Sequence, residues 1–270
     1  MSFNNSLRVI TKNDIINTFK ELGVVSGMVL EVCADLSTLD YLVGGAEVFV
    51  DALMETVGKD GTILMSLENE GNKEPSFQNN GTLSVADLSK IRNNLPAYNV
   101  NRNDIKDSNN VVANFRKRED IVYSAHPAYS FVSWGKHSKF LCNRQSLHFP
   151  LSEESPLARL YELRGSVLLV GVTYEKCSVM SLGEYRSDCR AIVLNGSAVE
   201  ISNQRTWKKY LDIEHNKNDY QEIGRLMERM NKVNEVNINK CGFKLFKADD
   251  ASSLLAEYLE KNKIYRLYHL

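Results

Sequence analysis

The strongest constraint on the fold is a strand–helix–strand pattern within residues 28–67. Residues 28–36 (MVLEVCADL) and 61–67 (GTILMSL) are short apolar runs typical of buried strands. Between them, residues 44–58 (GGAEVFVDALMETVG) open with two glycines and close on a third, which is typical of a helix bounded by turns. Two strands joined by a helix pair in parallel. The pattern therefore predicts a βαβ unit within an α/β protein.

A second alternation of helix and strand is predicted later in the chain. Ser155 and Pro156 form an N-cap and first-turn pair, and Gly165 ends the helix that they begin. Residues 166–172 (SVLLVGV) are continuously apolar, as expected for a strand buried on both faces. Further elements are predicted as helices over 11–22, 219–231 and 249–262, a strand over 239–249, and a β-hairpin over 191–202 turning at Asn195-Gly196.

Residues 68–110 do not show this alternation of helices and strands. They are polar and rich in Asn, Asp and Lys, with one weak helical segment at 85–95. We interpret them as a polar insertion, either a long surface excursion over a site or a flexible flap. With no linker that divides the chain, we expect residues 1–270 to form one α/β domain. It would be built around a mixed, largely parallel sheet with helices on both faces.

Composition excludes several classes of function. The 270 residues include 33 basic and 34 acidic side chains, a net charge of −1 that favours neither nucleic acid nor an anionic membrane. No apolar run is long enough to span a bilayer, and the N-terminus lacks a signal sequence, so we expect a cytoplasmic protein. The five cysteines contain no CxxC pair and the five histidines are scattered, so we expect neither a disulfide framework nor a metal site.

Two segments suggest where a ligand could bind. Residues 36–49 (LSTLDYLVGGAEVF) follow a strand and open a helix, where backbone amides and glycines favour a phosphate; a plain strand-to-helix turn is the alternative. Residues 124–135 (SAHPAYSFVSWG) hold His126 beside Pro127, which stiffens the loop. His126 could be a general base, or a hydrogen-bonded core histidine.

Two further segments carry acids. In residues 182–187 (LGEYRS), Glu184 could orient His126 and stabilise its protonated form, or could be an ion-paired glutamate. In residues 148–163 (HFPLSEESPLARLYEL), the loop with Ser152, Glu153 and Glu154 precedes a helix and could contribute to a site, or its acids could only complement the helix dipole.

Taken together, in order and spacing, these segments resemble the aminoglycoside 3-N-acetyltransferase family. The matching stretches are LSTLDYLVGGAEVFVDALMETVGKDGTILM, HPAYSFVSWGKH, FPLSEESPLARLYELRGSVLLVGVTYE and LGEYR. The resemblance implies an α/β fold distinct from the GNAT type. It also implies direct acetyl transfer, without a metal, from acetyl-CoA to an amine of an aminoglycoside or related amino sugar, an activity tied to antibiotic resistance. The protein would be a monomer or a homodimer.

The resemblance also implies roles for individual residues. His126 would be the general base and Glu184 its partner. Ser130 and Phe131 would line the thioester end of the cofactor, and Met65 and Ser66 would lie along the same channel. The residues implied to hold the CoA phosphates and pantetheine are Ser37, Val43, Gly44, Gly45 and Ala46.

Several positions depart from the family pattern. Cys33 stands where a histidine is usual, Asp40 replaces a glycine, and His148 replaces an aspartate. Ser181 stands where the aminoglycoside enzymes often carry histidine, and Cys177-Ser178 replaces Asn-Thr. Cys33 could then be a nucleophile in a Cys-His-Glu arrangement, or a small buried cysteine. These changes leave open a non-catalytic, CoA-binding relative that does not modify aminoglycosides, and a cofactor-free hydrolase using Ser130 or Cys33.

Overall fold

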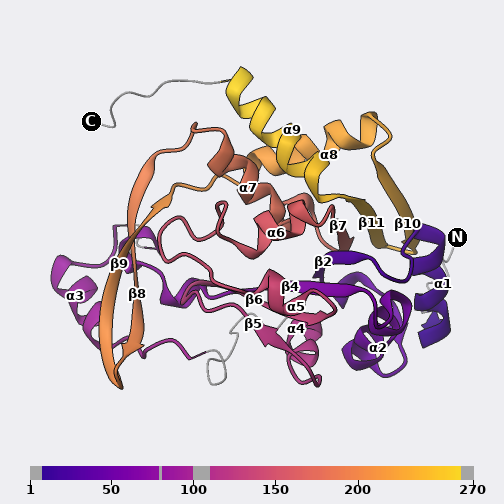
Figure 1. Ribbon diagram of the computed structural model, residues 1–270, viewed down its shortest axis with the longest axis horizontal. Helices are drawn as coiled ribbons and strands as arrows, with labels where there is room; N and C mark the ends of the chain where they lie inside the picture. Colours follow the sequence, from indigo (N-terminus) through magenta and orange to yellow (C-terminus); the bar gives the residue numbers. More distant parts are fainter. Residues whose placement is uncertain (1–7, 79–80, 100–109, 263–270) are drawn as a thin grey trace, which may run out of the picture.

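A seven-stranded mixed sheet forms the centre of the molecule in the computed structural model, which describes residues 8–78, 81–99 and 110–262 (Figure 1). The strand order is β10-β11-β7-β2-β4-β6-β5. The strands are β2 (Val29–Ala34), β4 (Thr62–Glu68), β5 (Val122–Tyr123), β6 (Tyr129–Gly135), β7 (Ser166–Val170), β10 (Val233–Ile238) and β11 (Cys241–Lys247).

The βαβ unit predicted from the sequence is confirmed. Strands β2 and β4 pair in parallel around α2 (Gly45–Val57), with Leu30 opposite Ile63. Strand β7 pairs in parallel with the other edge of β2. The outer pairings, β7 with β11 and β4 with β6, are antiparallel. The α/β fold with a mixed sheet is therefore confirmed, but parallel pairing is confined to the three central strands rather than dominating the sheet.

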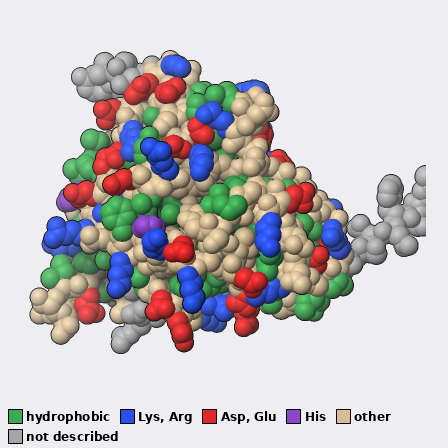
Figure 2. Space-filling model, turned by 45° about the vertical axis from the view of Figure 1, so that its right-hand side comes forward, with side chains coloured by type: hydrophobic (Ala, Val, Ile, Leu, Met, Phe, Trp, Pro, Cys, Tyr) green, Lys and Arg blue, Asp and Glu red, His purple; other side chains and the backbone are tan. Residues whose placement is uncertain are grey.

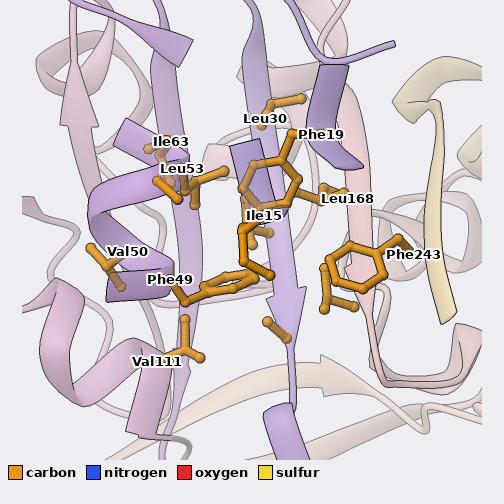
Figure 3. Close-up of a cluster of buried hydrophobic side chains, with 14 of the residues drawn as sticks. Ile15, Phe19, Leu30, Phe49, Val50, Leu53, Ile63, Val111, Leu168 and Phe243 are labelled. Atoms are coloured by element: carbon orange, nitrogen blue, oxygen red, sulfur yellow. The ribbon is translucent and has the colours of Figure 1, made fainter. Parts of the chain in front are cut away.

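Helices cover both faces of the sheet, as expected. On one face lie α1 (Lys12–Leu22), α2 and α4 (Asn110–Phe115), and on the other α5 (Ser138–Leu141), α6 (Pro156–Glu162), α7 (Val179–Arg186), α8 (Asn218–Arg229) and α9 (Ala248–Lys261). Figure 3 shows the first face, where Phe19 of α1 and Phe49 of α2 pack on the sheet with Phe243. The rings of Phe19 and Phe49 meet edge to face at 5.6 Å.

The alternation of strand side chains decides which residues reach which face. Leu30 and Val32 of β2 point into the core beneath α1 and α2. Glu31 and Cys33 point to the opposite face, toward α7. This alternation brings a buried carboxylate and a thiol to the side of the sheet that carries α7.

A long hairpin of β8 (Ile192–Ile201) and β9 (Gln204–Ile213) lies beside the sheet and corrects one prediction. The chain turns at Ser202 and Asn203, which both have positive φ, and not at Asn195-Gly196. Gly196 lies within β8 because Trp207 covers it: a Cβ there would come within 2.7 Å of the indole. Glycine serves this position by its small size and not by forming a turn.

The described part of the insertion at 68–110 packs against this hairpin. It contains η2 (Glu70–Asn72), η3 (Pro75–Gln78) and α3 (Val85–Asn94), the last confirming the predicted helical segment. The buried Asn72 side chain donates to Ala198 O at 3.2 Å and accepts from Ala198 N at 3.1 Å. The described part of the insertion is thus fastened to the hairpin; residues 79–80 and 100–109 lie outside the described chain.

The described surface agrees with the charge balance of the sequence. On the face in Figure 2, acidic and basic side chains are interspersed without a large field of one sign. Among the described residues, no helix has the length and apolar character needed to cross a membrane.

Candidate active site

A cavity of about 890 Å³ opens at the carboxyl ends of the three parallel strands. Its wall includes Cys33 and Asp35 at the end of β2, Ser66 of β4, and Val172 after β7. The chain leaves β2 toward α2 on one face and leaves β7 toward α7 on the other. A crevice at such a divergence is where open α/β sheets bind ligands.

The loop between β2 and α2 forms one side of this cavity. Asp35 accepts a hydrogen bond from Ser37 N at 2.9 Å and so begins η1 (Leu36–Thr38). Strand β3 (Tyr41–Leu42) then pairs with β1 (Val9–Ile10). Gly44, with a left-handed φ of 81°, precedes α2 without a side-chain cap. The first amides of α2 therefore remain available to an anionic ligand.

The cavity brings together part of the predicted CoA set. The members on its wall are Ser37, Gly45, Ala46, Ser66 and Phe131. Val43, Gly44, Met65 and Ser130 do not line it. Met65 is 1% exposed in the core beneath α2, and Ser130 lies on the opposite side of β6 from Phe131, hydrogen-bonded to Tyr98. The pleat of each strand gives alternate residues to the cavity, which the sequence resemblance did not resolve.

His126 lies in the interior and off the cavity wall. It is 1% exposed, and both ring nitrogens bond to backbone groups. Nδ1 accepts from Ala128 N at 3.1 Å and from Tyr129 N at 3.0 Å, so the proton is on Nε2, which donates to Leu147 O at 3.2 Å. Burial lowers the pKa of His126 to about 4. This is the hydrogen-bonded core histidine that the sequence left as an alternative.

Glu184 does not contact His126, which corrects the predicted pairing. The buried carboxylate accepts from Arg190 Nε at 2.8 Å, Asn216 N at 2.9 Å, Tyr220 OH at 2.7 Å and His215 Nδ1 at 2.6 Å. Burial acts to raise the pKa of Glu184, but these donors outweigh it and the pKa lies below its ordinary value. The histidine that this carboxylate contacts is therefore not His126.

That histidine is His215, two residues beyond β9. It lines the cavity, its side chain is 14% exposed, and it donates from Nδ1 to Glu184. Nε2 is buried without a hydrogen-bond partner among the described residues, and lies 3.8 Å from Asp212 Oδ1. Sequence reasoning missed His215 because it belongs to no motif: only the fold of the hairpin carries it to α7.

Two hydroxyls extend this network along the cavity wall. Tyr220 OH donates to Oε2 of Glu184, the oxygen that His215 also contacts. Ser181 Oγ lies 3.0 Å from Tyr220 OH. Since the single phenolic proton goes to the carboxylate, Ser181 is the donor of that contact. The family's usual histidine position is therefore filled by a serine that connects through Tyr220 to Glu184.

Glu31 anchors the helix that carries Glu184. Its carboxylate accepts from Ser178 N at 2.8 Å and Val179 N at 3.1 Å, at the start of α7, where Ser178 makes no side-chain cap. Burial raises the pKa of Glu31, against the lowering effect of these hydrogen bonds. A carboxylate from β2 thus caps α7 and fixes it to the sheet.

Cys33 lines the cavity but is not arranged as a nucleophile. Its thiol donates to Glu31 Oε1 at 3.6 Å, and burial together with the neighbouring carboxylate raises its pKa well above the ordinary value. A protonated thiol is a poor nucleophile, so the geometry favours the small-cysteine alternative. Among the residues described, no group of three or more His, Cys, Asp or Glu could hold a metal ion.

The fold is that of an α/β protein with a cavity at the carboxyl ends of its parallel strands. An uncapped helix N-terminus lies on one side of the cavity and a histidine held by a carboxylate on the other. The sequence model described as "Aminoglycoside 3-N-acetyltransferase" matches residues 32–260. The chain belongs to this family of acyltransferases, which confirms the resemblance drawn from its motifs.

One relative supports the same conclusion, and two further solved structures share the fold. The chain is 30% identical, over 253 residues and 93% of each chain, to the SPbeta prophage-derived aminoglycoside N(3')-acetyltransferase-like protein YokD of Bacillus subtilis. The crystal structure of YokD superposes with a TM-score of 0.89, covering 94% of this chain and 95% of that one. AAC-IIIb, solved as a binary complex with CoASH, is 19% identical with a TM-score of 0.83, covering 96% and 99%. Sisomicin-bound AAC-VIa is 21% identical with a TM-score of 0.82, covering 95% and 100%.

Proposed function

We propose that this protein transfers an acetyl group from acetyl-CoA to an amine of an aminoglycoside or related amino sugar, with His215 as general base. One observation carries the assignment of the base. His215 stands on the cavity wall, held through Nδ1 by the buried Glu184, with Nε2 unpartnered among the described residues. An imidazole whose far nitrogen is fixed by a carboxylate has its near nitrogen ready to accept a proton.

The donor side of the cavity supports acetyl-CoA as the co-substrate. The uncapped start of α2, at Gly45 and Ala46, offers amides to phosphate oxygens, and Lys176 and Lys217 add positive charge to the wall. Apolar side chains such as Leu36, Val112 and Phe131 suit the pantetheine arm. The CoASH complex of the structurally similar AAC-IIIb supports the same occupant.

The chemistry requires one proton to move twice. A neutral amine attacks the thioester carbonyl carbon, and His215 Nε2 takes a proton from the nitrogen as the C–N bond forms. The tetrahedral oxyanion then collapses, the C–S bond breaks, and the imidazolium returns the proton to the leaving CoA thiolate. Glu184 stabilises the transient imidazolium through its 2.6 Å contact with Nδ1. The products are an amide and CoASH.

The motif predicts His126 as the base, whereas we propose His215. The two histidines differ in their hydrogen bonds and in their access to the cavity. His126 has both nitrogens bonded to the backbone and a pKa lowered to about 4 by burial, so at neutral pH it is a weak base without access to the cavity. We therefore assign it a structural role, with its ring packing edge to face on Tyr210 at 5.1 Å.

The test is CoA thiol release from acetyl-CoA with a panel of amines that includes kanamycin-like aminoglycosides and simple amino sugars. Release that depends on amine and is lost in His215→Asn supports the proposal, and release without any amine indicates a hydrolase instead. Growth of a host on aminoglycosides, with and without expression of this chain, gives a second readout.

A non-catalytic, CoA-binding relative is the second candidate function. Ser181, at the position where aminoglycoside enzymes often carry histidine, favours it. Binding of CoA in calorimetry without thiol release for any amine would favour this candidate over the enzyme.

A further inference from the structure

Asp212 approaches the proposed base from the side opposite Glu184. It lies near the end of β9 and is 1% exposed. Its Oδ1 accepts from Tyr185 OH at 2.5 Å and Ile213 N at 2.9 Å, and its Oδ2 accepts from Asn195 Nδ2 at 3.3 Å. Three donors from α7, β8 and β9 thus fix the carboxylate in one orientation.

The space between Asp212 and His215 is bordered by a buried carboxylate and by a ring nitrogen without a hydrogen-bond partner among the described residues. When His215 is neutral and donates an Nδ1–H hydrogen bond to Glu184, Nε2 presents a lone pair. The nearest oxygen of Asp212 is 3.8 Å away, and Nε2 has no hydrogen-bond partner among the described residues. Oδ1 of Asp212 already accepts from Tyr185 OH and Ile213 N, so Nε2 of His215 is the atom left unsatisfied here. A cationic nitrogen that donates to Nε2 can direct a second N–H to the carboxylate.

We propose that Asp212 and His215 together receive the ammonium group of the acceptor, so that Asp212 selects amines that arrive as cations. The inference rests on the proposed acetyl transfer. A nitrogen about 2.8 Å from each partner spans a 3.8 Å gap, and an ammonium carries three N–H donors. A carboxylate that is already oriented binds the cation without reorganisation.

The proton balance of this arrangement is complete. The bound ammonium first loses one proton to solvent through Nε2 of His215 and becomes the neutral nucleophile beside Asp212. Nε2, neutral again, takes the second proton as the C–N bond forms. That second proton goes to the CoA thiolate as the C–S bond breaks.

Other acids that could attract a cationic acceptor are arranged differently. Glu153 pairs with Arg186 at 2.7 Å on the surface. Glu175 lines the cavity wall, in η4 (Tyr174–Lys176). Of these three acids, Asp212 is the one fixed beside the proposed base.

The experiment compares two acceptors in the full-length protein: a simple alkylamine, which is a cation at neutral pH, and an O-alkylhydroxylamine, which is uncharged. We expect Asp212→Asn to raise KM for the alkylamine by roughly tenfold or more, and to leave KM for the hydroxylamine close to wild type. Calorimetric binding of the alkylamine to the protein with CoASH should weaken in parallel.

Two further variants separate charge from structure. Tyr185→Phe removes one hydrogen bond to Asp212 but keeps the charge, so it should retain the preference for the cation. Asp212→Glu, which keeps a carboxylate, should restore part of the preference for the cationic acceptor that Asp212→Asn loses. Equal effects of Asp212→Asn on both acceptors, or no effect on either, would overturn the role of Asp212 while thiol release by the wild type stands. Absence of release by the wild type with every amine would overturn the proposed function itself.

Discussion

Nδ1 of His215 lies 2.6 Å from Oε2 of Glu184, although the two residues are 31 positions apart and belong to different elements. Helix α7 supplies the carboxylate and the residues following β9 supply the imidazole. The same carboxylate oxygen also accepts from Tyr220 OH at 2.7 Å. The pair joins the helical layer on the sheet to the hairpin at the edge of the cavity, and the predictions below follow from it.

Replacement of His215 by Asn should remove most acetyl transfer and leave CoA binding intact. A positioned base contributes on the order of 10²–10⁴ in rate, and the loop at residues 35–46, which we propose holds CoA, is built by other segments. Thiol release measures the first effect and calorimetric titration of CoA the second. A turnover unchanged from wild type in His215→Asn would eliminate His215 as the base.

Replacement of His126 by Asn should reduce stability more than activity. Two backbone amides and Leu147 O depend on its ring, and leaving buried groups unsatisfied costs about 1–3 kcal/mol. Because the ring is off the cavity wall, kcat should change by less than about tenfold, below the loss expected for a base. Denaturant unfolding and thiol release on the same preparation provide the comparison. A folded variant with kcat reduced a thousandfold would restore His126 as the base.

The lowered pKa of His126 should make stability depend on pH. Its pKa is about 4 in the folded protein against an ordinary 6.5, so the unfolded state binds more protons between these values. The contribution is fully present above about pH 6.5 and is lost as the pH falls toward 4. At pH 5 the wild type should have lost roughly 2 kcal/mol of this contribution.

The matched measurement is unfolding of the wild type and His126→Asn at pH 7.5 and pH 5. Other titrating groups are common to both proteins, so the stability gap between them should narrow at pH 5. A gap that stays constant would mean that His126 titrates normally in the folded state.

Replacement of Glu184 by Gln should lower kcat on the order of 10²-fold with little change in the KM for acetyl-CoA. The side chain accepts from four donors, and an amide would place its own N–H groups against one of them while removing the charge that favours the imidazolium. Tyr220→Phe removes one donor and keeps the charge, so its kcat should fall less. If both variants lost activity equally, the hydroxyl network rather than the charge would be the important feature.

Replacement of Gly171 by Ala should disturb the loop at residues 35–46, which we propose holds CoA. Gly171 has a φ of +63°, and a Cβ there would lie 2.1 Å from the backbone oxygen of Asp35. We expect a loss of about 1–3 kcal/mol in stability and weaker CoA binding. Gly27→Ala is the matched control: its φ is +87° but no atom lies within 4 Å of the added Cβ. Equal CoA affinity in the two variants would show that the contact with Asp35 does not shape the site.

Local signals were sufficient for much of the fold. The glycine-bounded helix between two apolar runs predicted β2, α2 and β4, and Ser155-Pro156 predicted α6, because caps and periodicity act within a few residues. The predicted turn at Asn195-Gly196 was wrong since Trp207, eleven residues later, packs over Gly196 and holds it in a strand. Contacts between distant residues outweigh a local turn preference.

Local periodicity and motifs in a fixed order were enough to predict the α/β class and the family. Which histidine contacts Glu184 depends on how distant elements pack. His126 belongs to a recognisable motif but lies in the interior, where two backbone amides donate hydrogen bonds to its Nδ1. His215 stands in no motif, but the hairpin that precedes it returns to α7 and brings its ring within hydrogen-bond distance of the carboxylate. Pairing between residues distant in sequence depends on how elements pack, and no local pattern encodes it.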